Sequence, residues 1–113
     1  MTHQPKIGLA VLIAGFCLAA SSAWAASPSF DCAKASSDVE KMICKDAELA
    51  ELDNSLASLY STVLKNTPAS GQKTLKAEQR GWVKGRDDCW KSDDLRGCVS
   101  NEYRSRIAEL KDR

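Results

Sequence analysis

The sequence predicts a small all-α protein, a disulfide-stapled bundle of about four helices that includes an antiparallel helix hairpin. Apolar residues recur at three- and four-residue spacing over several segments, as on the buried faces of helices. No segment alternates apolar and polar residues for long enough to indicate a β-strand. Outside the N-terminal apolar segment the chain holds an even number of cysteines, which in a short exported chain is typical of disulfides. These are Cys32, Cys44, Cys89 and Cys98.

Residues 1–25 have the features of a cleaved signal peptide. A short start ending at Lys6 precedes an apolar stretch over residues 7–20, and Ala23-Trp24-Ala25 forms a small-residue cleavage site. The apolar stretch is too short to span a bilayer comfortably. Cys17 follows a bulky phenylalanine where a lipoprotein site has a small residue, so we expect no lipid anchor. The prediction is a periplasmic or secreted protein with no stable membrane anchor and a single helical domain over residues 26–113.

Composition excludes several classes of function for this domain. The only histidine, His3, lies in the predicted signal peptide, so the domain lacks Ser–His and Cys–His catalytic pairs and histidine metal sites. The four cysteines are too widely spaced for a zinc site, and we expect neither a metal nor a cofactor. Removing Lys6 leaves equal numbers of acidic and basic residues, so nucleic acid is not an expected partner.

The first elements of the domain are a loose leader and a short helix. Residues 26–30 contain Ser-Pro-Ser and are expected to have no packing of their own. Ser37 and Glu40 fit a capping box, which predicts a helix over residues 38–45. Cys44 would lie in its last turn and reach back to Cys32.

Two longer helices are expected next. Asp46 can cap a helix with an apolar face that extends from Leu49 to Leu64, before Asn66-Thr67-Pro68 ends it. Residues 68–71 are predicted to form a linker, followed by a third helix that continues to about Trp90. Gly81 and Gly85 would weaken that helix by about 1 kcal/mol each relative to alanine, or would permit a close helix crossing.

The last helix is expected to be capped by Ser92 or Asp93 and to continue almost to the C-terminus. Four cysteines allow three pairings, and the helical arrangement favours nearest neighbours: Cys32 with Cys44, and Cys89 with Cys98. The second pair would then clamp the turn of an antiparallel helix pair. Each loop is short, and chain entropy gives about 2.5 to 3 kcal/mol for each disulfide.

One run of residues carries a family resemblance. Gln-Arg-Gly-Trp-Val-Lys-Gly-Arg-Asp-Asp-Cys, residues 79–89, is followed by Cys98 and by Tyr-Arg-Ser-Arg-Ile-Ala-Glu-Leu, residues 103–110. Together with the upstream segments 30–35, 39–44 and 49–53, it resembles the LprI-type lysozyme inhibitor N-terminal domain family. The resemblance implies binding to a muramidase and inhibition by blocking its carbohydrate cleft. This sequence departs from the family pattern at Gly81 and Gly85, where alanine is more usual.

A contact surface can be suggested around the predicted clamped turn. Many lysozymes are cationic, and their cleft holds a carboxylic acid and a carboxylate, so an inhibitor benefits from an acidic rim and an inserted donor. Trp90 directly follows a cysteine in the turn, where little core is available, and is a candidate for an exposed contact. The alternative is that the charges are ordinary solvated loop residues. The rim candidates are Asp87, Asp88, Asp93 and Asp94, and the donor candidates are Lys91 and Arg96.

The other residues of the run are expected to be structural. With few aromatic residues in the chain, Trp82 is expected in the core. Arg86 is expected to pair with a helix end or with a buried carboxylate such as Asp53 or Glu102. The alternative is an exposed Trp–Arg anchor. The same structural interpretation covers the remaining motif positions, Gln79, Tyr103 and Arg106.

Two other classes of function need no histidine. A cell-wall hydrolase using two carboxylates needs no histidine, but four short helices offer no obvious cleft for a sugar chain, so we expect no enzyme. An envelope interaction module with a partner other than lysozyme would use the same acidic turn, and the sequence does not separate it from an inhibitor. The oligomeric state is also left open.

Overall fold

The computed structural model describes residues 27–113, all helical or irregular with no strand in that range. It confirms the predicted all-α class. The predicted signal peptide over residues 1–25 and the domain start at Ala26 lie outside the described residues. The elements are η2 (Cys32–Lys34), α2 (Asp38–Lys45), α3 (Ala47–Asn66), α4 (Ala69–Asp87), η3 (Asp88–Lys91) and α5 (Leu95–Lys111).

The start of α2 has the predicted capping box. The Ser37 hydroxyl accepts a hydrogen bond from the Glu40 backbone N–H at 3.0 Å, and the Glu40 carboxylate accepts one from the Ser37 backbone N–H at 3.2 Å. Asp46 ends α2 and caps α3, accepting from the Leu49 N–H at 3.1 Å. These reciprocal bonds satisfy backbone donors that would otherwise be unpaired at a helix start.

Three predicted boundaries were wrong. Residues 68–71 form no linker, because α4 begins directly after Pro68, whose carbonyl accepts hydrogen bonds from the backbone N–H groups of Gly71 and Gln72. The third helix ends at Asp87, and a tighter 3-10 turn continues to Lys91. Asp94 rather than Ser92 or Asp93 caps α5, accepting from the Gly97 N–H at 2.9 Å.

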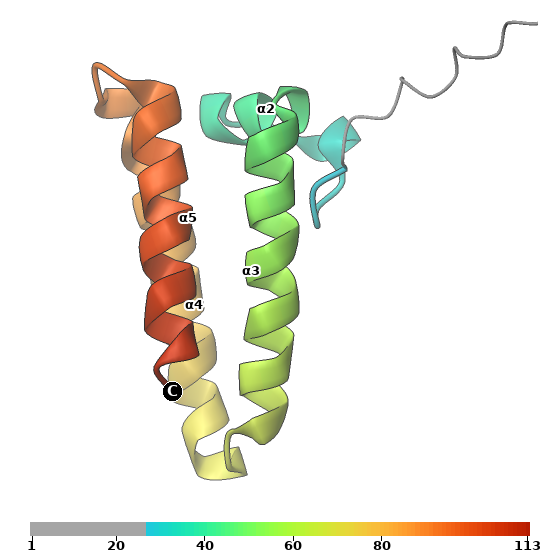
Figure 1. Cartoon of the computed structure of the whole chain (residues 1–113), viewed down its shortest axis with the longest axis vertical. Helices are drawn as coiled ribbons and strands as arrows, with labels where there is room; N and C mark the ends of the chain where they lie inside the picture. Colours follow the sequence, from blue (N-terminus) through green and yellow to red (C-terminus); the bar gives the residue numbers. More distant parts are fainter. Residues whose placement is uncertain (1–26) are drawn as a thin grey trace, which may run out of the picture.

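The helices do not pack in simple sequence order. α3 packs mainly against α5 and α2, while α4 packs against α5. In Figure 1, α4 and α5 lie side by side, α3 runs along them, and α2 covers the upper end near the start of α3. The predicted close crossing at the α4 glycines is absent, because a Cβ at Gly81 would meet nothing within 4 Å and one at Gly85 only the end of a glutamate side chain at 3.8 Å. The buried core residues are Val39, Ile43, Leu49, Leu56, Leu75, Cys89, Val99, Tyr103 and Leu110.

Residues 27–31, here called the strap, are packed against α3, so the expectation of a loose leader was wrong. Pro28 is buried. The backbone N–H and the hydroxyl of Ser29 both donate to Asp53 at 2.6 Å, and the Asn54 side chain donates to the Ser27 carbonyl at 2.5 Å. The strap is therefore held against α3 by hydrogen bonds and by burial of Pro28.

Two disulfides, with the pairing that the helical arrangement favours, staple the same end of the bundle, where α2 and η3 are in contact (Figure 1). Cys32 and Cys44 join η2 to the last turn of α2, with their Cα atoms 6.0 Å apart. Cys89 and Cys98 join η3 to α5, with a Cα separation of 5.7 Å. The first holds the strap in place, and the second closes the connection between α4 and α5.

Candidate functional site

The connection from Asp87 to Arg96, here called the clamped turn, carries the most exposed large apolar side chain of the described residues. Trp90 is 62% exposed, whereas the preceding Cys89 is 2% exposed. The two side chains therefore point in opposite directions from η3, the cysteine toward the disulfide and the tryptophan toward solvent. The Lys91 ammonium lies 5.6 Å from the Trp90 ring centroid, within cation–π range.

Some charged residues of the clamped turn remain available for a partner. Lys91 lies 3.7 Å from the Asp88 carboxylate, and both side chains are more than 60% exposed. A pair this exposed contributes little stability. Asp93 is also exposed. The exposed charged groups next to Trp90 in the clamped turn are thus the loosely paired Asp88 and Lys91, together with Asp93.

Other predicted contact residues have intramolecular roles. Asp94 caps α5, and Asp87 accepts two hydrogen bonds from Arg86, at 3.0 Å from Nε and 2.7 Å from Nη2. Arg96 donates to Asp46 at 2.6 Å and also pairs with Glu48.

The contacts of Arg96 shift two pKa values. The hydrogen bonds to Asp46 and Glu48 raise the pKa of Arg96. The Arg96 hydrogen bond, followed by that from the Leu49 N–H, lowers the pKa of Asp46. Arg96 therefore fastens the start of α5 to the start of α3, and it is poorly suited to be the inserted donor suggested from the sequence.

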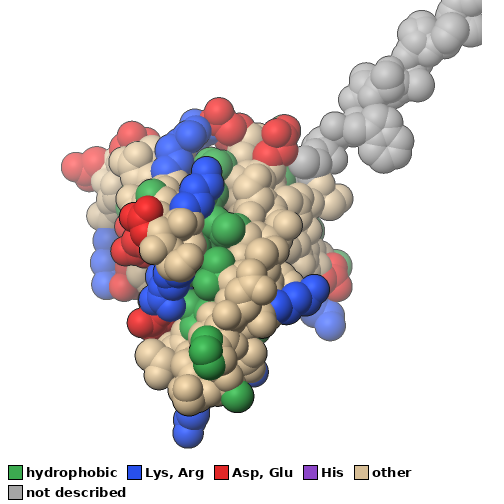
Figure 2. All heavy atoms as spheres, turned by 60° about the horizontal axis from the view of Figure 1, so that its bottom comes forward, with side chains coloured by type: hydrophobic (Ala, Val, Ile, Leu, Met, Phe, Trp, Pro, Cys, Tyr) green, Lys and Arg blue, Asp and Glu red, His purple; other side chains and the backbone are tan. Residues whose placement is uncertain are grey.

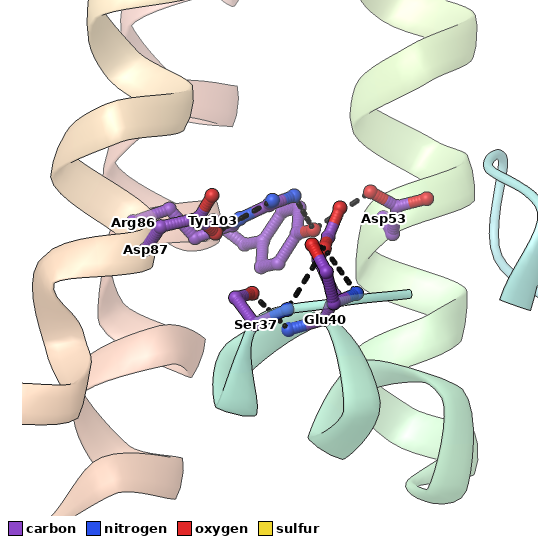
Figure 3. Close-up of polar contacts among 7 residues, drawn as sticks. Ser37, Glu40, Asp53, Arg86, Asp87 and Tyr103 are labelled. Carbon is purple, nitrogen blue, oxygen red and sulfur yellow. Dashed lines mark hydrogen bonds and ion pairs between the residues drawn. The ribbon is translucent and has the colours of Figure 1, made fainter. Parts of the chain in front are cut away.

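A buried polar chain crosses the bundle from α3 to α4 through α5. Figure 3 shows Tyr103 reaching between Arg86 and Asp53. Its hydroxyl donates to Asp53 Oδ1 at 2.7 Å and accepts from Arg86 Nη1 at 3.0 Å. Arg86 is therefore linked to Asp53 through the Tyr103 hydroxyl, whereas a helix end or a buried carboxylate such as Asp53 or Glu102 was the expected partner.

Within this buried polar chain, burial and neighbouring charges shift the pKa values of Tyr103 and Arg86 in opposite directions. Burial raises the pKa of Tyr103, and the Arg86 charge offsets part of that rise. Burial alone would lower the pKa of Arg86, but its contacts with Tyr103 and Asp87 outweigh burial and raise it. The Arg86 guanidinium also lies within 6.0 Å of the ring centroids of Phe30, Trp82 and Tyr103. Arg86 thus stays charged among three aromatic rings, and its guanidinium is hydrogen-bonded to Tyr103 and Asp87.

The remaining motif residues tie α4 to α5. The Trp82 indole N–H donates to the Glu102 carbonyl at 3.1 Å, and its ring packs edge-on against Tyr103 with centroids 5.0 Å apart. Arg106 donates from Nε to Gln79 Oε1 at 2.9 Å and from Nη1 to Glu109 at 3.2 Å. Its Nη2 is buried without a hydrogen-bond partner among the described residues.

A groove that the sequence did not predict lies between α3 and α4. Its volume is about 340 Å³, within the range of small-ligand sites. The two helices are neighbours in sequence but do not pack closely along their length, and the strap closes one end of the space between them. The expectation that the four helices offer no obvious cleft was therefore wrong. The lining residues are Ser29, Phe30, Glu40, Asp53, Leu56, Ala57, Tyr60, Gln79, Trp82, Val83 and Arg86.

The two carboxylates of the groove, Glu40 and Asp53, both accept hydrogen bonds from within the fold. The acid and base pair of a glycosidase needs one carboxyl with a raised pKa. Backbone hydrogen bonds from Ser36 and Ser37 instead lower the pKa of Glu40. Asp53 accepts three hydrogen bonds, two from Ser29 and one from Tyr103.

A second hollow lies between α3 and α5. It is lined by Leu52, Leu59 and Ile107, with Arg104 and Lys111 beside them. Figure 2 shows a stripe of apolar side chains on the face in view, bordered by lysine and arginine. Within residues 27–113 no cluster of potential metal ligands was found, and none of the helices there is long and apolar enough to cross a membrane.

Comparison with known proteins identifies relatives over most of the described fold. A family model described as lysozyme inhibitor LprI matches residues 31–110. Proteins named lipoprotein LprI, from Mycobacterium bovis and Mycobacterium tuberculosis, are 33% identical over 85 residues. That match covers 75% of this chain and 42% of each relative, so the chain spans less than half of their length. No solved structure matches.

Proposed function

Because the chain belongs to the lysozyme inhibitor LprI family, we propose that it binds a lysozyme and blocks the cleft in which peptidoglycan is cleaved. The observation that carries the proposal is Trp90, which is 62% exposed on a turn that a disulfide holds rigid. Large aromatic side chains at the centre of an interface supply much of its binding energy. A rigid turn also loses little conformational entropy when it binds.

The proposed contact is the free part of the clamped turn. Trp90 is the anchor, and Asp88 and Asp93 form an acidic rim that suits a cationic partner. Lys91 is the donor inserted toward the catalytic carboxyls of the lysozyme, because its side chain is 61% exposed and its one ion pair is long. Arg96 is excluded from that role by its contacts with Asp46 and Glu48.

The proposed site of action is outside the cytoplasm. Two disulfides staple the described domain, and disulfides persist in oxidising compartments such as the periplasm. The matched relatives are named lipoproteins, which is compatible with this location. N-terminal sequencing of the exported protein tests it directly, with residue 26 expected at the new N-terminus.

The test is peptidoglycan lysis by c-, g- and i-type lysozymes, each titrated with the oxidised protein. We expect stoichiometric inhibition of at least one class. Truncating a central aromatic anchor costs about 2 kcal/mol or more, so Trp90→Ala should weaken inhibition at least about thirtyfold. Asp88→Ala and Asp93→Ala should mainly slow association at low salt and make the association rate less dependent on salt concentration.

The matched control is Glu51→Ala, which removes one exposed acidic charge from α3 away from the clamped turn. It should inhibit as the unaltered protein does. Equal inhibition by Trp90→Ala and Glu51→Ala would move the contact elsewhere. Unchanged lysis in all three classes would remove lysozyme as the partner, and capture of another envelope protein that added lysozyme fails to displace would then establish the interaction-module alternative.

A further inference from the structure

We propose that the α3–α4 groove is a binding site for a neutral saccharide, separate from the clamped turn. The groove combines aromatic side chains with fixed polar groups in a space of about 340 Å³. Ligand sites of this kind are mostly apolar, with a few well-placed polar groups. A sugar ring matches such a lining because it has apolar C–H faces and hydroxyl groups around its edge.

Three partly buried aromatic residues face the groove from three elements. Phe30 comes from the strap, Tyr60 from α3 and Trp82 from α4. They leave apolar surface for a flat ring to cover, because none of them is fully buried. The Phe30 side is rigid, since the Cys32–Cys44 disulfide and the Ser29 hydrogen bonds hold the strap.

Hydrogen-bonding groups lie along the same groove. Glu40 and Asp53 are acceptors, each held in place by bonds from the backbone or hydroxyl of serine residues. Gln79 accepts from Arg106 through its Oε1, which fixes the amide and leaves its NH₂ group to donate. A ligand with hydroxyls that both donate and accept can use these groups together.

The charged side chains that line the groove favour a neutral ligand over an ion. The groove contains two carboxylates and one guanidinium, so an anion meets an excess of negative charge. The guanidinium of Arg86 is already engaged by Asp87 and Tyr103. The excess negative charge would attract a cation, but the Arg86 guanidinium already lies within 6.0 Å of the Phe30 and Trp82 ring centroids and opposes the binding of a second cation against these rings.

The groove is proposed to bind and not to cleave. Cleavage requires a protonated carboxyl beside the scissile bond. Glu40 has a lowered pKa, set first by backbone hydrogen bonds from Ser36 and Ser37. The proposal is therefore limited to binding.

The experiment is an NMR titration of the oxidised, nitrogen-15-labelled protein with neutral trimers of N-acetylglucosamine and of glucose. Their concentration is raised to about 10 mM, above the millimolar dissociation constant of a weak small-ligand site. The indole N–H signal of Trp82 should shift saturably with at least one trimer. The indole of Trp90, on the clamped turn, should not shift and serves as the internal control.

Two neighbouring substitutions on α3 form a matched pair. Tyr60→Ala removes an aromatic face from the groove and should weaken binding about tenfold. Leu59→Ala removes a side chain of the other hollow, between α3 and α5, and should change binding less than about twofold. Circular dichroism checks that both variants are folded.

Three results would overturn the proposal: no shift of the Trp82 signal with either trimer, a shift confined to Trp90, or equal weakening by the two variants. The Trp82 signal of the unaltered protein decides the question even if Tyr60→Ala does not fold. No lysozyme is present in the titration, so its outcome is independent of the inhibition assay.

Discussion

Tyr103→Phe removes a single oxygen atom from the buried chain between α3 and α4. The side chain is fully buried, and its hydroxyl is bonded to Asp53 at 2.7 Å and to Arg86 at 3.0 Å. Phenylalanine has the same shape, so the substitution leaves packing almost unchanged and isolates the two hydrogen bonds. The measured quantity is the free energy of unfolding.

The expected loss is about 3 kcal/mol. A hydrogen bond to a charged group contributes about 1.5–3 kcal/mol. Each charged partner keeps other contacts, Asp53 with Ser29 and Arg86 with Asp87, so the lower limit applies to each bond. A domain of this size has about 4–13 kcal/mol of stability in total, so the loss is a large fraction of it.

The assay is equilibrium unfolding in urea at neutral pH, followed by far-ultraviolet circular dichroism. The midpoint should fall with an unchanged slope. Tyr60→Phe is the control, because it makes the same chemical change at a half-buried tyrosine outside the chain of bonds, and it should cost less than about 0.5 kcal/mol. A loss below about 1 kcal/mol for Tyr103→Phe, or one equal to that of the control, would refute a stabilising role for the buried chain.

Two further predictions concern the upper end of the bundle. The pKa of Glu40 is lowered below its ordinary value of 4.5, so its charge stabilises the fold above that pH, and the contribution disappears as the pH falls through the lower folded value. Glu40→Gln should therefore reduce the free energy of unfolding at neutral pH and match the unaltered protein in strong acid; a difference that persists there would contradict this. Joint replacement of Cys32 and Cys44 by alanine should cost about 2.8 kcal/mol, from a sequence separation of 12, and speed hydrogen exchange at the Ser29 amide. Unchanged exchange would mean that the disulfide does not hold the strap.

Local sequence signals were sufficient for most helices. The capping box of Ser37 and Glu40 and the cap of Asp46 use contacts three residues apart, and both were predictable from residue type and spacing. The cap of α5 was misplaced by one residue because Ser92, Asp93 and Asp94 are all suitable cap residues in a row. Which of them caps depends on where the 3-10 turn of η3 ends.

Long-range polar contacts could not be predicted in the same way. The bond from Ser29 to Asp53 joins residues 24 apart, so the strap resembled a loose Ser-Pro-Ser leader in the sequence. The exposure of Trp90 could be predicted from the sequence, because this residue directly follows a disulfide-bonded cysteine in a turn. The α3–α4 groove was not, since its existence depends on α3 packing against α5 instead of its sequence neighbour.

The packing of α3 on α5 also governs how the chain reaches its native state. Two of the contacts that join these helices, Asp53 with Tyr103 and Asp46 with Arg96, each link residues 50 apart. Closing a loop of that length costs about 3.5 kcal/mol of entropy before any contact forms. The helical hairpin of α4 and α5 needs only a short connection. We therefore expect the main kinetic barrier to folding to lie in bringing α3 onto an α4–α5 hairpin that forms earlier, so that the slow step would belong to the segment synthesised first.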